Sequence, residues 1–165
     1  MEFSRWRSLP VLVAFALIVS GCGFQLRSAT AFPPQMSRIY IDASDRYTPF
    51  YREVSNAIRA SDADIVRDPL SADSVIHIHR DLTGRRSLSV SIRNIPREYE
   101  IYYTVDFSVD INEVEVLTPQ TLTLTRDYTY DETVVLGKER EERILRDAIA
   151  SDLVGLMQQR ISTVR

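Results

Sequence analysis

The chain begins with an unbroken hydrophobic segment that differs from everything behind it. Residues 9–19 carry no polar side chain and follow Arg5 and Arg7. As a helix at roughly 1.5 Å per residue, this segment is about 16 Å long, which is too short to cross a bilayer core comfortably. A basic start followed by a short hydrophobic core is typical of a signal peptide.

Hydrophobic positions recur with the helical period of 3.6 in two later segments. Between positions 50 and 58, four apolar residues share one face behind Thr48-Pro49, which suits an N-cap followed by the first helical residue. A longer helix is predicted over residues 139–161. Its hydrophobic stripe consists of Leu145, Ala148, Ile149, Leu153, Leu156 and Met157.

Alternation of hydrophobic and polar residues with a period of two indicates β-strands. A short strand is predicted over residues 38–42, and residues 65–66 could add a short extended segment. A further strand over residues 74–80 is followed by a predicted hairpin turn at residues 83–86. Beyond that turn, the hydrophobic face is predicted to continue through Leu88, Val90 and Ile92.

The strongest strand pattern covers residues 99–111, long enough that a bend or bulge is expected. A turn at residues 118–120 then leads to a last strand over residues 122–130. The order strand, helix, long strands, helix predicts an α+β fold. The predicted architecture is a two-layer sandwich, in which two helices cover one face of a four-stranded sheet that is mostly antiparallel or mixed. Residues 38–165 are interpreted as a single domain.

Composition narrows the functional classes. The 23 acidic residues outnumber the 20 basic ones, for a net charge of −3, and nothing indicates a nucleic-acid-binding surface. The single cysteine excludes an internal disulfide.

That single cysteine, Cys22, stands directly behind the hydrophobic segment. Residues 19–22 read Val-Ser-Gly-Cys, which resembles the lipobox of bacterial lipoproteins. In that family the peptide bond before the cysteine is cut and the cysteine is acylated. The resemblance implies that residues 1–21 are removed and that residues 22–37 form a lipidated N-terminus and tether. Gly23, rather than aspartate, points to the outer membrane. A buried free cysteine is the alternative, but its position after a signal peptide argues against it.

Candidate catalytic and metal-binding residues are scarce. His77 and His79 would project from one face of a strand and could share a metal, but no third histidine or second cysteine exists. Two partly exposed histidines on a sheet surface are the alternative interpretation. No nucleophile motif and no glycine-rich phosphate loop is present, so we expect neither an enzyme nor a cofactor.

Basic residues gather where strands are predicted to connect. Arg85, Arg86, Arg93 and Arg97 surround two connections, and Lys138 precedes the long helix. If these connections meet at one end of the sheet, they form a basic patch suited to a phosphorylated ligand. A solvated rim of loops is the alternative.

Arg126 occupies an inward position within the alternation of the last predicted strand. A buried unpaired charge is costly, so this guanidinium needs a partner, and Asp106 and Asp127 are candidates. A structural ion pair and a ligand-binding role both remain open.

Several short strings together resemble the LptE (RlpB) family of lipopolysaccharide-assembly lipoproteins. Residues 22–27, Cys-Gly-Phe-Gln-Leu-Arg, are similar to the start of its mature members. Residues 91–94, Ser-Ile-Arg-Asn, are similar to the family's connection between long strands. Arg126 with Tyr130-Asp131, and Lys138 before the last helix, also match its pattern.

The resemblance implies a non-enzymatic outer-membrane lipoprotein that plugs the β-barrel protein LptD and binds lipopolysaccharide. It assigns phosphate contacts to Arg93 and Lys138, with Arg85 and Arg86 as further candidates. Structural or partner roles fall to Arg126, Tyr130 and Asp131. Two alternatives stay open: another periplasmic lipoprotein that binds phospholipid, and a lipid-anchored hydrolase that uses His77 or His79.

Overall fold

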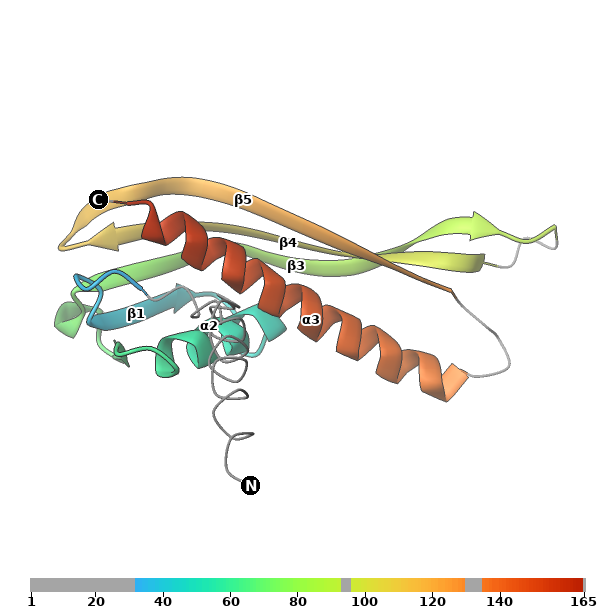
Figure 1. Ribbon diagram of the computed structural model, residues 1–165, viewed down its shortest axis with the longest axis horizontal. Helices are drawn as coiled ribbons and strands as arrows, with labels where there is room; N and C mark the ends of the chain where they lie inside the picture. Colours follow the sequence, from blue (N-terminus) through green and yellow to red (C-terminus); the bar gives the residue numbers. More distant parts are fainter. Residues whose placement is uncertain (1–31, 93–95, 130–134, 165) are drawn as a thin grey trace, which may run out of the picture.

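The structure, a computed structural model, describes residues 32–92, 96–129 and 135–164. Its elements follow the chain as β1 (Arg38–Ala43), α2 (Pro49–Arg59), β2 (Asp64–Ile65), the short 3-10 helix η1 (Pro69–Ser71), β3 (Ser74–Val90), β4 (Pro96–Ile111), β5 (Val114–Thr129) and α3 (Val135–Ser162). Figure 1 shows three long strands beside α3.

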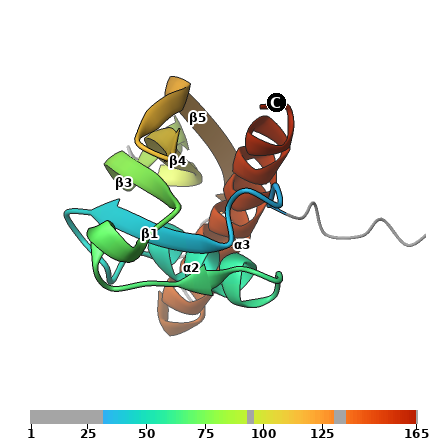
Figure 2. The same cartoon turned by 90° about the vertical axis from the view of Figure 1, so that its left-hand side faces the viewer.

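The strands form one mixed sheet of five strands in the order β2-β1-β3-β4-β5. β1 runs parallel to β2 and β3, and the β3–β4 and β4–β5 pairs are antiparallel. Both described helices lie on one side of the sheet (Figure 2). The predicted α+β sandwich is confirmed, with one strand more than expected because Asp64–Ile65 pairs with β1.

The hydrophobic core lies between the sheet and the helices. Phe50, Val54 and Ile58 of α2 are fully buried, as the helical spacing predicts. Phe32 and Met36, at 8% and 1% exposed, belong to the same core, so the last residues of the predicted tether pack against the domain.

The two helices start close to their predicted positions. The Thr48 hydroxyl accepts a hydrogen bond from the Tyr51 N–H at 3.1 Å, which confirms Thr48 as the N-cap of α2. Helix α3 begins at Val135, before the predicted residue 139, and ends at Ser162.

The turn predicted at residues 83–86 is wrong, because β3 continues through it to Val90. Gly84 pairs with Tyr102 of β4. A Cβ at Gly84 would lie 2.4 Å from the Tyr102 hydroxyl. Glycine at this position therefore leaves room for the Tyr102 side chain within the sheet. The sequence alone does not distinguish such a glycine from one that forms a turn.

A β-bulge near His79 exchanges the two faces of β3. Ile78 pairs with Phe107 but Arg80 pairs with Asp106, so β3 carries one extra residue. One extra residue turns the side chains that follow it to the opposite face, up to the further register shifts between Ser87 and Val90. The predicted hydrophobic face at Leu88, Val90 and Ile92 is also wrong, because these side chains are 47%, 54% and 108% exposed.

The turn predicted at residues 118–120 is also wrong. The β4–β5 hairpin turns at Asn112 and Glu113, whose φ angles of 50° and 65° suit a two-residue turn. Residues 118–120 lie within β5, beside a register shift between the pairs Val109–Leu117 and Phe107–Gln120. Pro119 lacks an N–H group, and a bulge on an edge strand is where a sheet tolerates it.

Candidate functional site

β3 and β5 end, and β4 begins, at the end of the sheet farthest from the β4–β5 turn. β3 ends at Val90, which pairs with Pro96 at the start of β4. β5 ends at Thr129, which pairs with Glu98. The end of β3, the start of β4 and the end of β5 therefore lie at one end of the sheet (Figure 1), whereas Arg85 and Arg86 lie within β3 and not in a connection.

Several predicted site residues fall outside the described residues. Arg93 belongs to residues 93–95, and Tyr130 and Asp131 belong to residues 130–134. Cys22 lies before residue 32. Lys138 lies in α3, but its side chain is outside the described set. These assignments stay predictions.

Arg85 and Arg86 are described, and they point to opposite faces of β3. Arg86 pairs with Glu100 on the face away from the helices, with Nη2 2.8 Å from Oε2. Arg85 stands opposite the buried Ile101 and faces α3. The structure therefore separates two arginines that the sequence places side by side.

Arg85 belongs to a polar cluster centred on one carboxylate of α3, which we call the Glu142 cluster. Its members are Arg85, Tyr99, Tyr128, Glu142 and Arg146. Glu142 Oε1 accepts hydrogen bonds from Arg85 and from the Tyr128 hydroxyl. Oε2 accepts from Arg146, one helical turn further, at 3.1 Å.

Aromatic contacts complete the Glu142 cluster. The Arg85 guanidinium lies over the Tyr99 ring, 4.8 Å from its centroid. Tyr99 stacks on Tyr128 with ring centroids 5.7 Å apart. The cluster thereby connects α3 to β3, β4 and β5.

The environment of Glu142 favours its charged form. Burial alone would raise the pKa of this carboxyl group, but hydrogen bonds from Tyr128 and Arg85 outweigh burial and hold the pKa below its ordinary value. Burial, followed by the bond to Glu142, raises the pKa of Tyr128 to about 12. The carboxylate and the phenol are therefore a fixed acceptor and donor near neutral pH.

Two further ion pairs hold α3 to the rest of the fold. Asp152 pairs with Arg126 of β5 at 2.5 Å, and Asp147 pairs with Arg52 of α2 at 2.8 Å. Arg126 does lie on the helix side, because it stands opposite the buried Ile101. Its partner is Asp152 rather than Asp106 or Asp127, so the structure favours a structural ion pair.

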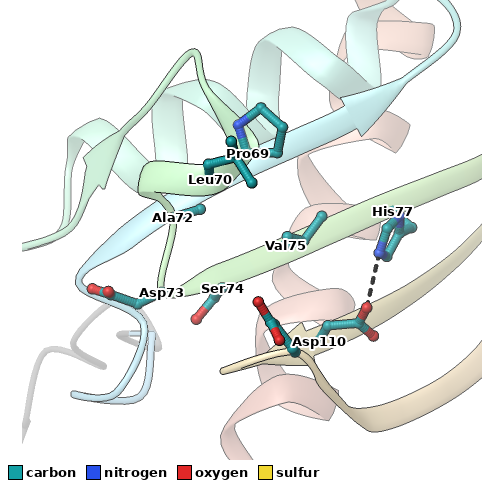
Figure 3. Close-up of a pocket in the computed structure, with 9 residues that line it drawn as sticks. Pro69, Leu70, Ala72, Asp73, Ser74, Val75, His77 and Asp110 are labelled. Carbon is teal, nitrogen blue, oxygen red and sulfur yellow. Dashed lines mark hydrogen bonds and ion pairs between the residues drawn. The ribbon is translucent and has the colours of Figure 1, made fainter.

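The two histidines lie on the sheet face away from the helices, and His77 lines a hollow of about 270 Å³. His77 Nδ1 is 3.0 Å from Asp42, and its Nε2 is 3.1 Å from Asp110. Figure 3 shows the latter contact at the edge of the hollow. The carboxylates flank opposite ring nitrogens, so they do not converge on a common point. Across the described residues, no group of three or more acidic, histidine or cysteine side chains could hold a metal ion.

His79 has a serine neighbour but no accessible nucleophile beside it. Its Nε2 lies 2.8 Å from the Ser108 hydroxyl, and its ring stacks on His77 with centroids 5.9 Å apart. Ser108 is only 4% exposed, so a substrate could not reach its oxygen. This pair therefore gives no support to a hydrolase.

The rest of that sheet face is a plane of polar side chains joined across strands. Arg80 pairs with Asp106 at 2.8 Å, and Asp106 also accepts from Thr121 of β5 at 2.7 Å. Thr104 and Thr123 share a hydrogen bond of 3.0 Å.

In the part of the chain that the structure describes, no helix has both the length and the hydrophobicity to span a membrane.

Known proteins are similar to this chain in sequence and in fold. A family model described as LptE, lipopolysaccharide-assembly, matches residues 36–161. The LPS-assembly lipoprotein LptE of Yersinia enterocolitica is 30% identical over 156 residues, covering 91% of this chain and 75% of that protein. The protein of the same name in Pectobacterium atrosepticum is 28% identical over 162 residues, covering 97% and 88%.

Two solved structures of lipoproteins have a fold similar to that of this chain. Lipoprotein B of Nitrosomonas europaea matches with a TM-score of 0.69 and 25% identity, covering 85% of this chain and 90% of that one. The rare lipoprotein B of Shewanella oneidensis matches with a TM-score of 0.65 and 25% identity, covering 76% and 94%.

Proposed function

Because this chain belongs to the LptE family of lipopolysaccharide-assembly lipoproteins, we propose that it binds lipopolysaccharide while seated in the β-barrel LptD. The observation that carries the proposal is the extent of the family match, which covers residues 36–161 and so nearly all of the described fold. Lipopolysaccharide assembly is a non-enzymatic role, as the sequence predicts.

The uncovered sheet face supports a barrel partner. Its charges are already paired within the face, as in Arg80–Asp106 and Arg86–Glu100, and its threonines hydrogen-bond across strands. These paired polar groups suit the polar interior of a large barrel, although Leu82 on the same face is 50% exposed.

Phosphate contacts are assigned to the end of the sheet where the two connections meet. Arg85 and Arg86 are engaged by Glu142 and Glu100, so the proposal relies chiefly on Arg93 and Lys138. Arg97, exposed at the start of β4, is a further cation at this end. Arginine and lysine bind phosphate through charge-assisted hydrogen bonds.

The proposed place of action is the outer membrane. Relatives of this chain are LPS-assembly lipoproteins, and Cys22 is the residue we assign to acylation. Two or more acyl chains would hold the domain stably at the membrane surface.

A charge-reversal variant tests the ligand site. We expect Arg93→Asp/Lys138→Asp to lose most of its binding to purified lipopolysaccharide while keeping its circular dichroism and melting temperature. The matched control is Arg59→Asp/Arg67→Asp, which makes the same charge change at two exposed positions away from this end. Wild-type binding by the first variant would sink the assignment.

Co-purification tests the partner. The proposal predicts a stable one-to-one complex with LptD when the lipidated protein is extracted from outer membranes. Recovery of the protein without any barrel, together with phospholipid, would support the alternative of a phospholipid-binding lipoprotein instead.

A further inference from the structure

We propose that Glu142 is a positioning residue for the lipopolysaccharide site, because it fixes the start of α3 against the end of the sheet. This inference rests on the proposed function, in which Arg93 and Lys138 bind lipopolysaccharide. It adds a residue that makes no ligand contact itself and that holds the helix from which Lys138 extends.

The first step is the place of Lys138 in the chain. It stands one helical turn before Glu142 in α3, a rise of about 6 Å at 1.5 Å per residue. Arg93 belongs to the connection that leaves β3 at Val90 and returns at Pro96. The position of the helix backbone at Lys138 therefore depends on how α3 is held against the sheet.

The second step is that Glu142 performs this attachment. Its Oε1 accepts from Arg85 of β3 and from Tyr128 of β5, and Tyr128 stacks on Tyr99 of β4. One carboxylate thus fixes the helix to all three long strands close to the proposed site.

The third step is that hydrophobic packing contributes little to this part of the helix. The buried apolar side chains of α3 begin at Ile149, and Leu145 is only partly buried. Among residues 139–144, whose side chains the structure describes, Glu142 is the one that is buried, at 7% exposed. Its position is therefore set by polar contacts, which a single substitution can remove.

The test uses Glu142→Gln, which keeps the size of the side chain but removes the charge that both arginines share. We expect lipopolysaccharide binding to weaken about tenfold, a scale typical of coupling within one side-chain network. The control is Asp152→Asn, which removes the α3 ion pair to Arg126 from the well-packed part of the helix. That variant should bind like the wild type.

A double-mutant cycle separates positioning from general destabilisation. If Glu142 acts through Lys138, Glu142→Gln has little further effect on binding in a Lys138→Ala background. A merely structural role would weaken binding by the same factor in both backgrounds. Tyr128→Phe, which removes one donor to Glu142 and keeps the aromatic ring, provides a milder second variant if Glu142→Gln folds poorly.

Lys138 also offers a direct signal, because it is the only lysine in the chain. After reductive methylation with ¹³C-formaldehyde, its dimethylamine gives one lysine resonance in the full chain purified in detergent. We expect lipopolysaccharide to shift this resonance in the wild type and in Asp152→Asn, and to shift it less in Glu142→Gln.

The outcomes distinguish the two proposals. Unchanged binding in both Lys138→Ala and Arg93→Ala contradicts the proposed ligand site. Weakened binding in those variants, together with wild-type binding or a fully independent loss in Glu142→Gln, overturns the positioning role alone. Loss that disappears in the Lys138→Ala background, with the reduced resonance shift, supports it.

Discussion

At the scale of single residues, His77 shows how one ring can join three strands. Its two nitrogens face Asp42 of β1 and Asp110 of β4, and the histidine itself belongs to β3. His79 stacks against it from the same strand. Both nitrogens can donate only when the ring is protonated, so this geometry favours the imidazolium.

The protonation of His77 predicts a dependence of stability on pH. Partial burial lowers the pKa of His77, but hydrogen bonds to Asp42 and Asp110 outweigh burial and leave the pKa above its ordinary value of 6.5. The stability gained is complete below that ordinary value and is lost as pH rises through the folded-state pKa. We expect the free energy of unfolding in urea to fall as pH rises above 6.5.

The control for this pH effect is His77→Gln, which should show a flatter profile across the same range. An NMR titration that placed the His77 pKa at or below 6.5 would contradict the interpretation.

The two glycines with described surroundings predict opposite effects of alanine. At Gly155, in an exposed part of α3, nothing lies within 4 Å of a new Cβ. Gly155→Ala should therefore stabilise the protein by about 0.5–1 kcal/mol. Gly84→Ala should not stabilise, because its Cβ would meet the Tyr102 hydroxyl at 2.4 Å. Thermal melts of both variants check the contrast, and equal gains would count against it.

At the scale of elements, the start of α2 is fixed to the sheet by one buried hydroxyl. The Phe50 N–H donates to the Tyr103 hydroxyl at 3.1 Å, and both residues are fully buried. Burial holds the pKa of Tyr103 above its ordinary value, so it remains a neutral phenol.

Removing this hydroxyl is expected to be costly. Tyr103→Phe leaves a buried backbone donor without its acceptor, which should lower the free energy of unfolding by about 1–3 kcal/mol. Tyr40→Phe is the control, because its hydroxyl receives only a long 3.4 Å contact from the exposed Arg46. Denaturant unfolding of both variants decides the matter, and an equally small loss in each would refute the prediction.

The elements also show which parts of the fold the sequence could predict. The cap and stripe of α2 and the long alternation around residues 99–111 are local patterns, and the structure has them. Leu156 of the predicted α3 stripe is an exception, because it is 38% exposed. The two wrongly predicted turns are at Gly84 and Pro119. Glycine and proline often mark turns in a sequence, but here both residues lie inside paired strands. The bulge near His79 depends on how β3 pairs with β4, which local alternation does not reveal.

The candidate site was predictable only in part for the same reason. That β3 and β5 end together follows from strand pairing, which the sequence alone leaves as an open condition for the basic patch. Neighbouring residues of a strand face opposite sides, so the separation of Arg85 from Arg86 follows from strand geometry, but which of them faces α3 depends on the bulge. Glu142 reads in the sequence as one more acid near the start of a helix, and only the packing of α3 on the sheet makes it a shared partner.

At the scale of the whole molecule, several carboxylates predict loss of stability in acid. Hydrogen bonds from Arg38 and Ser37 lower the pKa of Asp73 to about 2. The pKa values of Glu142 and Asp106 also lie below their ordinary values of 4.5 and 3.8, since bonds to their partners outweigh burial. Such groups stabilise the fold above their unfolded pKa values and lose that effect as pH falls through the folded ones.

We therefore expect the urea midpoint to fall steeply below pH 4.5, which is the ordinary value of the glutamate. Glu142→Gln should be less stable than the wild type at pH 6 and should lose less on going to pH 3. A parallel pair of pH profiles would show that Glu142 is not one of the responsible groups.

The burial of Phe32 and Met36 limits the distance between the domain and Cys22. With Cys22 acylated as proposed, the segment from Cys22 to Phe32 can span at most roughly 35 Å. A tether that extended through residue 37, as the sequence predicted, would span about half as much again. An acylated Cys22 would therefore keep the domain close to the membrane, and a barrel that encloses the domain would have to open at that surface.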